Sequence, residues 1–293
     1  MTVDSQAPAA TAGPTTPRPT RHRTLRRYLG ALRRPRGAVG ITLLGVLVAA
    51  AVLVPLFSSG YDAQSMNTFA GPSWAHPFGT DELGRDIAVR TLYGLRIDLV
   101  LLSAGVLTAM VLGTVLGAIG ALSRALGLFF QRVFDIIQGF PSLILGMVVA
   151  LLVGPGMLAL SISIVIFALP GFGRLARAGL LSQERREYVL AAQTMGIPRW
   201  RVLVRHILPN TIDPIIVHTA IAMVIAIFLE TGLSVVGLGI QPPEPSLGSL
   251  LNSGVRFLSL APVYVLGPAI VLILLALSFS LLSDALNEEV LRK

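Results

Sequence analysis

The sequence predicts an all-α membrane protein with six transmembrane helices, and three observations lead to this prediction. Of the 293 residues, 54% are hydrophobic and only 13% are charged, about half the charged fraction of soluble domains. Charged residues are absent from four stretches, 37–61, 99–123, 136–173 and 257–283. Each stretch can supply the roughly 20 residues that a helix needs to cross the hydrocarbon core. Finally, basic residues cluster beside these stretches.

The uncharged stretches and one further apolar stretch divide into six spans. The run 136–173 is too long for one crossing, and Gly154-Pro155-Gly156 interrupts it, so we interpret it as a hairpin of two spans. The first span exceeds the roughly 7–15 apolar residues of a signal peptide and is expected to stay uncleaved. The six predicted spans are, in chain order, 37–57, 99–122, 136–153, 157–173, 211–236 and 261–282.

The basic residues predict the orientation of the chain. Of the 23 Lys and Arg residues, 19 lie before span one, between spans two and three, between spans four and five, and after span six. Because basic residues beside spans stay on the cytoplasmic side, both termini are expected there. Residues 1–36 are predicted to be a largely disordered, arginine-rich cytoplasmic tail, and 286–293 the cytoplasmic C-terminus.

The predicted outer segment, 58–97, is expected to carry an amphipathic helix. Residues 80–82, Thr-Asp-Glu, are typical of a helix start, because threonine caps free amides and acidic residues complement the helix dipole. A helix through Leu83, Ile87 and Leu92 is expected to lie on the membrane surface. A plain connector is the alternative interpretation.

The predicted inner segment, 174–210, contains two short helices. Residues 183–194 have helical patterning, and residues 199–208 form a second helix. Between them, Gly196 permits a tight turn with positive φ, and Pro198 suits the first turn of the second helix. A DNA-reading helix-turn-helix is disfavoured, because membrane spans begin within a few residues of both ends. A solvated loop is the other alternative.

Composition excludes several classes of chemistry. The chain has no cysteine, so it has no disulfide framework, thiolate metal site or cysteine nucleophile. Its one lysine, Lys293, follows no glycine-rich loop, so we expect no P-loop ATPase in this chain. The histidines lack metal-ligand spacing, and no serine has a nucleophile-elbow context. We therefore expect a non-enzymatic protein without cofactor or metal, and the distribution of its +8 net charge argues against nucleic acid.

Several stretches together resemble a known family. Residues 187–192 (EYVLAA), Gly196 and residues 206–210 (HILPN) resemble the EAA loop of binding-protein-dependent ABC importer permeases. More narrowly, the chain is similar to the C-type permeases of dipeptide and oligopeptide importers. The further stretches that carry this likeness are 76–86 (HPFGTDELGRD), 140–143 (FPSL) and 233–243 (LSVVGLGIQPP).

The resemblance implies a type I ABC importer permease fold. Residues 98–285 correspond to a five-helix permease core, in which a coupling loop at 181–210 docks into a cleft of the ATPase. Leu190 occupies the position of the glutamate that names the motif, so no salt bridge can form from that position. The residues expected to couple to the ATPase are Glu187, Tyr188, Ala191, Ala192, Gly196, Arg199, Arg205, His206, Pro209 and Asn210.

The coupling residues are expected to act in different ways. Ala191 and Ala192 are expected to keep one helix face shallow enough to enter the groove. The loop arginines, Arg199 and Arg205 among them, are either partner contacts or charges that keep the loop inside.

The implied function is that of a permease subunit in an ATP-driven importer of di- and oligopeptides in the bacterial cytoplasmic membrane. The implied partners are a second homologous permease, two ATP-binding subunits that hold ATP and Mg²⁺, and an extracytoplasmic peptide-binding protein. Related permeases also serve importers of nickel chelates and glutathione, and these substrates remain alternatives.

A secondary transporter or channel is the alternative from a different class. Such a protein is expected to carry several ionisable residues at mid-membrane depth. Glu230, towards the outer end of span five, is the strongest candidate of this kind. We expect Glu230 to have a structural role, in which it holds span five to the outer loop that follows.

Overall fold

The computed structural model describes residues 30–183 and 186–291. Within these ranges the regular structure is helical, with one isolated bridge between Thr80 and Asp86, so the predicted all-α fold is confirmed. The α-helices are, in chain order, α2 (Pro35–Phe57), α3 (Ile87–Leu122), α4 (Arg124–Gly139), α5 (Ser142–Val153), α6 (Met157–Gln183), α7 (Glu187–Thr194), α8 (Arg199–Val202), α9 (Ile212–Val235), α10 (Leu247–Val255) and α11 (Val263–Leu291).

Five helices, α2, α3, α6, α9 and α11, are long and apolar enough to cross a membrane, and the bent pair α4 and α5 makes a sixth crossing if it counts as one span. This pair corrects the prediction of a single helix over 136–153. α4 already begins at Arg124, and the chain bends by 95° between α4 and α5. Pro141 accounts for the break, because proline lacks a backbone N–H and disfavours helical geometry at the preceding residue.

The start of α3 corrects a second prediction. Its N-cap is Asp86, whose side chain accepts a hydrogen bond from the backbone N–H of Val89 at 3.0 Å. The helix therefore begins at Ile87 and continues unbroken into the predicted second span, instead of forming a separate surface helix from residue 80. Thr80 and Asp81 are buried in the preceding loop, where they satisfy polar groups of the loop itself and are not available as a helix start.

An ion pair holds that loop together. The carboxylate of Asp81 accepts a hydrogen bond from Nε of Arg85 at 2.7 Å, and Asp62 lies 3.3 Å from the same guanidinium. Burial opposes the charged form of Arg85, but Asp81 and Asp62 outweigh this effect and raise the pKa of Arg85. The loop is therefore an ordered structure with its own charge pairing.

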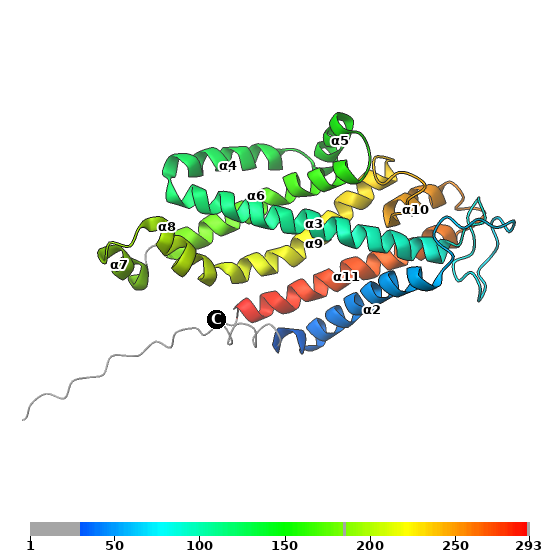
Figure 1. The fold of residues 1–293 in the computed structure, drawn as a ribbon, viewed down its shortest axis with the longest axis horizontal. Helices are drawn as coiled ribbons and strands as arrows, with labels where there is room; N and C mark the ends of the chain where they lie inside the picture. The colour runs from blue at the N-terminus through cyan, green and yellow to red at the C-terminus, as the bar shows by residue number, and fades with distance from the viewer. Residues whose placement is uncertain (1–29, 184–185, 292–293) are drawn as a thin grey trace, which may run out of the picture.

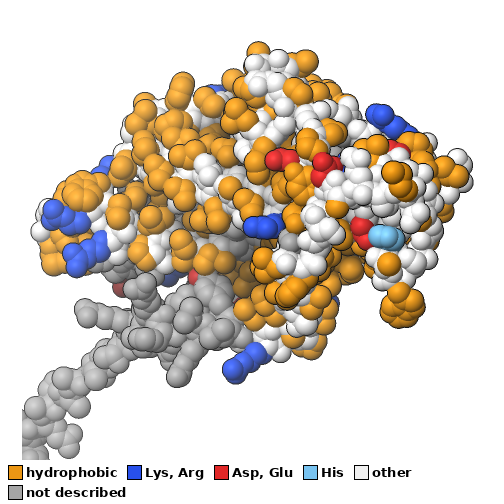
Figure 2. All heavy atoms as spheres, turned by 45° about the vertical axis from the view of Figure 1, so that its right-hand side comes forward, with side chains coloured by type: hydrophobic (Ala, Val, Ile, Leu, Met, Phe, Trp, Pro, Cys, Tyr) orange, Lys and Arg blue, Asp and Glu red, His pale blue; other side chains and the backbone are white. Residues whose placement is uncertain are grey.

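The helices form one bundle with two distinct ends (Figure 1). In this view α2 and α11 lie side by side along one edge, α4 and α5 lie at the opposite edge, and α3, α6 and α9 lie between them. We call the end that carries α7 and α8 the loop end, and the end with residues 58–86 and α10 the far end. Hydrophobic side chains predominate between the two ends on the face shown in Figure 2, as expected of a surface that contacts lipid.

Close contact between α3 and α6 depends on glycine. A Cβ added at Gly113 would lie 2.6 Å from the carbonyl oxygen of Leu169, and one at Gly117 would overlap the carbonyl oxygen of Gly173. Small residues let membrane helices approach closely, and dispersion contacts then stabilise the pair. Gly113 and Gly117 therefore form a small-residue packing surface on α3.

We predict that Gly117→Val destabilises the protein, because the new side chain must displace the backbone of α6. Overpacking of this kind costs about 1–3 kcal/mol. The matched control is Gly45→Val on α2, where an added Cβ has no neighbour within 4 Å. Thermal unfolding of the purified protein in detergent should show a lower melting temperature for the first variant only. Equal melting temperatures would contradict the packing described here.

Candidate functional site: the loop between α6 and α9

The loop from residue 186 to residue 211 connects α6 to α9 and holds most of the predicted site residues. α7 ends at Thr194, and Gly196 then adopts φ of 75°, so the prediction of two short helices across a left-handed glycine turn is confirmed. Pro198 is the N-cap of α8, with ψ of 141°, and does not lie in its first turn as predicted. After Val202 the helix continues as a π-helical turn, 203–207, and a 3₁₀ turn, 208–210.

One face of this loop is anchored to the bundle by apolar contacts. Its buried side chains pack on Leu180 of α6 and against Ala118 and Ala121 near the end of α3. The members of this cluster, which we call the anchor cluster, are Leu180, Val189, Ala192, Val202, Leu203 and Ile207. Because protein interiors are close-packed and transmit strain, the loop and the ends of α3 and α6 are expected to move together.

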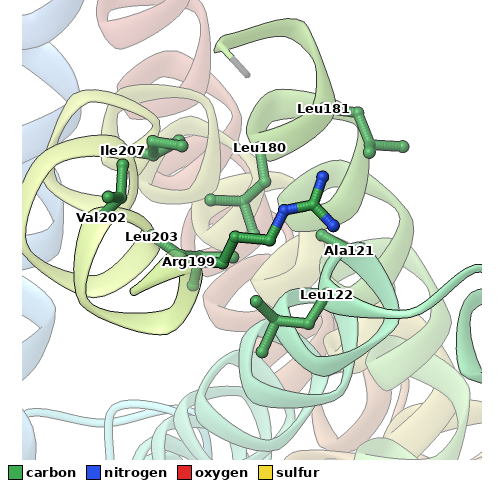
Figure 3. Close-up of a pocket in the computed structure, with 8 residues that line it drawn as sticks. All are labelled: Ala121, Leu122, Leu180, Leu181, Arg199, Val202, Leu203 and Ile207. Carbon is green, nitrogen blue, oxygen red and sulfur yellow. The ribbon is translucent and has the colours of Figure 1, made fainter. Parts of the chain in front are cut away.

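The anchor cluster leaves a cavity of about 30 Å³ between the loop and the bundle. Figure 3 shows Leu180 and Leu181 from α6, Ala121 and Leu122 from α3, and the loop side chains around it. The side chain of Arg199 extends from the start of α8 towards the ends of α3 and α6 (Figure 3). Arg199 therefore belongs to the boundary between loop and bundle as well as to the exposed loop surface.

The opposite face of the loop is exposed and combines apolar with basic side chains. Met195 is 72% exposed and Trp200 is 56% exposed. The guanidinium of Arg201 lies 5.3 Å from the centroid of the Trp200 ring, within the range of a cation–π contact. An open hollow of about 530 Å³ lies beside them, and it is lined by Trp200, Arg201, Val204, Arg205 and Pro209. We call the exposed surface formed by these five residues and Met195 the docking face.

The structure separates two residues that the sequence placed on one surface. Ala191 is exposed, whereas Ala192 is 5% exposed and belongs to the anchor cluster. The prediction that both alanines form the shallow outer face is therefore wrong for Ala192, because adjacent helical residues point about 100° apart. Glu187 and Gly196 are exposed, and so are Arg205 and Pro209 of the docking face.

The structure does not describe the side chains of some predicted residues, and one exposed aromatic residue of the loop was not predicted. The side chains of Tyr188, His206 and Asn210 are not described. Trp200 was not predicted as a site residue, although a tryptophan between two arginines in a polar loop is an unusual pattern. Aromatic and arginine side chains are enriched where proteins bind each other, and this enrichment was the available signal.

Glu230 lies in α9 near the far end and is 2% exposed. Its carboxyl group accepts hydrogen bonds from Ser234 Oγ at 2.7 Å and from Thr231 Oγ1 at 3.3 Å. Ser234 in turn packs on α10, since a Cβ added at Gly248 would lie 2.5 Å from the Cβ of Ser234. The buried Glu230 thus lies directly behind the contact between α9 and α10.

A second buried carboxyl group, Asp98 of α3, holds the start of α10. Its Oδ2 accepts a hydrogen bond from the backbone N–H of Leu247 at 2.9 Å, and the side chain of Ser246 caps the same helix. An acidic group at a helix N-terminus satisfies free amides and complements the dipole. Asp98 was missed because its partner is 149 residues away in the sequence, and only the fold brings the two together.

Comparison with known proteins places the chain in a family. Residues 92–292 match the family described as binding-protein-dependent transport system inner membrane component. A dipeptide transport system permease protein of Alkalihalophilus pseudofirmus is 36% identical, over 85% of this chain and 83% of its own. One of the same description from Lactococcus lactis is 39% identical, over 72% of this chain and 62% of its own.

A further relative is named for a different substrate. The glutathione transport system permease protein of Pectobacterium atrosepticum is 34% identical, over 90% of this chain and 88% of its own. The helical bundle, the loop with its glycine turn and the family match agree with one another. The chain therefore belongs to the binding-protein-dependent transport system inner membrane components, as a non-catalytic permease subunit.

Proposed function

We propose that the chain is one permease subunit of an ATP-driven importer that carries di- and oligopeptides into a bacterial cell. Relatives named as dipeptide permeases, 36% and 39% identical to this chain, support the peptide substrate. A further relative, 34% identical to this chain, is named as a glutathione permease. Glutathione is a modified tripeptide, so this relative also agrees with a peptide substrate. We place both termini and the loop end in the cytoplasm, on the evidence of the basic residues in the inner segments.

In this proposal the docking face binds a cytoplasmic ATPase subunit. Exposed Met195 and Trp200 can insert into an apolar groove, as amphipathic helices do when they bind partners. Arg201 and Arg205 can pair with acidic groups around such a groove. The complete importer also contains two ATPases, a second homologous permease and an extracytoplasmic binding protein. When the ATPases move, the anchor cluster transmits their movement to α3 and α6 as rigid-body motion.

Glu230 and Asp98 have a structural role in this proposal. Each is buried and hydrogen-bonded next to α10, so together they hold the far-end helix against α3 and α9. This arrangement supports the importer over a secondary transporter, which would use intramembrane acids to bind and release coupling ions.

Uptake measurements test the proposed substrate. A strain that lacks its own peptide importers and expresses the complete system should take up radiolabelled dialanine and trialanine only when the ATPases are intact. Loss of nickel or glutathione uptake with unchanged peptide uptake, on deletion of this chain, would overturn the peptide assignment.

We predict that Trp200→Ser weakens ATPase docking. We expect Trp200 to be a hot spot of the interface, and truncation of such a residue costs at least about 2 kcal/mol, which is roughly a 30-fold loss of affinity. Titration of purified ATPase onto the permease pair in nanodiscs measures the effect. The chain has two tryptophans, and Trp74, fully exposed in the far-end loop, supplies the matched control Trp74→Ser. Equal ATPase affinity of both variants would contradict the proposed docking face.

We predict that Glu230→Gln retains transport, because the amide oxygen still accepts the hydrogen bond from Ser234. Glu230→Leu should lower the melting temperature, since an unpaired buried polar group costs about 1–3 kcal/mol. Both variants are measured for peptide uptake and thermal unfolding. Complete loss of uptake in Glu230→Gln, with the protein still folded, would instead indicate that a titrating carboxyl group drives transport.

A further inference from the structure

A groove lies along the membrane-spanning helices between α6, α9 and the end of α4. It has a volume of about 150 Å³, and its walls are mostly apolar, with Phe167 from α6 and Ala222 and Ile225 from α9 among them. Along α9 it extends from His218 to Leu229, a rise of about 16 Å at 1.5 Å per residue. The groove therefore covers about half of the roughly 30 Å hydrocarbon thickness.

Two polar but uncharged side chains face this groove, His218 and Gln138. His218 is held in place by an edge-on contact with Phe172, with 4.8 Å between ring centroids, and its Nε2 fills the space that a side chain at position 171 would need. Among the described residues, no hydrogen bond joins either ring nitrogen to another protein group. The ring nitrogens are not among the fully buried polar atoms, so they are available to a polar group that enters the groove.

The break between α4 and α5 lies beside Gln138. Residues 139–141 are exposed there and the chain turns by 95°, so the last carbonyl groups of α4 lack the partners that a continuing helix would supply. Irregular backbone at membrane depth persists only where protein buries it or where it lines a water-filled path. Broken helices at this depth also form the solute sites of many transporters.

We propose that this groove is part of the translocation path and that its ligand is the main chain of the transported peptide. The proposal rests on the proposed function. The imidazole of His218 and the side-chain amide of Gln138 supply both donors and acceptors, which peptide N–H and C=O groups require. No lining residue is Asp, Glu, Lys or Arg. The groove therefore binds the amide groups that all peptides share and accepts peptides with different side chains.

Single cysteines test this proposal without background in this chain, because it contains no native cysteine. Ile225→Cys places a thiol in the groove, and Ile41→Cys on α2 is the matched control, since the two isoleucines are 41% and 43% exposed. The complete importer, with its other subunits made cysteine-free, is reconstituted in lipid vesicles. Labelling by a charged, water-soluble methanethiosulfonate is followed with and without trialanine, binding protein and ATP.

We expect the thiol at position 225 to react, the thiol at position 41 to stay unreacted in lipid, and trialanine turnover to slow the first reaction several-fold. An unreactive thiol at position 225 would show that lipid or the second permease fills the groove, which overturns the inference. Trialanine uptake without protection overturns it also and leaves the proposed function standing. Absence of trialanine uptake by the assembled importer overturns the peptide assignment itself.

A second pair of variants tests the role of the imidazole. His218→Leu should reduce trialanine uptake by roughly three- to tenfold, the range expected from the loss of one neutral hydrogen bond, with an unchanged melting temperature. His218→Gln restores a donor and an acceptor and should recover most of the uptake. If His218→Leu transports trialanine at the wild-type rate, His218 is not a peptide contact.

Discussion

The anchor cluster is the contact on which the attachment of the loop to the helical bundle depends. A loop that only connected two membrane helices would transmit no force, because flexible backbone absorbs displacement. Here Val189 and Ala192 of the first short helix and Val202 of the second are buried against Leu180 of α6. The hydrophobic effect thus fixes the loop to the bundle on one face, and the docking face remains free on the other.

The two ends of the helical bundle are stabilised by different kinds of contact. At the loop end, apolar contacts hold the segment that we propose binds the ATPase. At the far end, buried carboxyl groups hold α10, and the Asp81–Arg85 pair orders the preceding loop. Between the two ends, Gly113 and Gly117 let α3 approach α6 closely. Because these helices are tightly packed, a movement of the loop end is transmitted along them towards the far end. This continuity suits a subunit that works without chemistry of its own.

The order of the helices and the position of the loop were predictable, because uncharged stretches, the Gly154-Pro155-Gly156 turn and Gly196 are local signals. The break between α4 and α5 was not, and neither were three further features. The start of α3 depends on Asp86, because Asp81 is buried in the preceding loop, where Arg85 occupies its carboxylate. Ala191 and Ala192 have the same propensity, and only packing decides which one is buried. Asp98 finds its partner across 149 residues. Residue spacing alone does not show which side chains are buried or which distant residues meet in the fold.

The most direct test of the central claim is a distance measurement across the anchor cluster. Spin labels attached through Met195→Cys and Leu181→Cys, both at exposed positions, report the distance between the loop and the end of α6 in the assembled importer. Rigid-body coupling predicts the same distance with and without bound ATP, while distances from position 195 to the second permease change. A change between positions 195 and 181 during productive transport would show that the loop moves independently of the bundle, and would contradict rigid-body coupling.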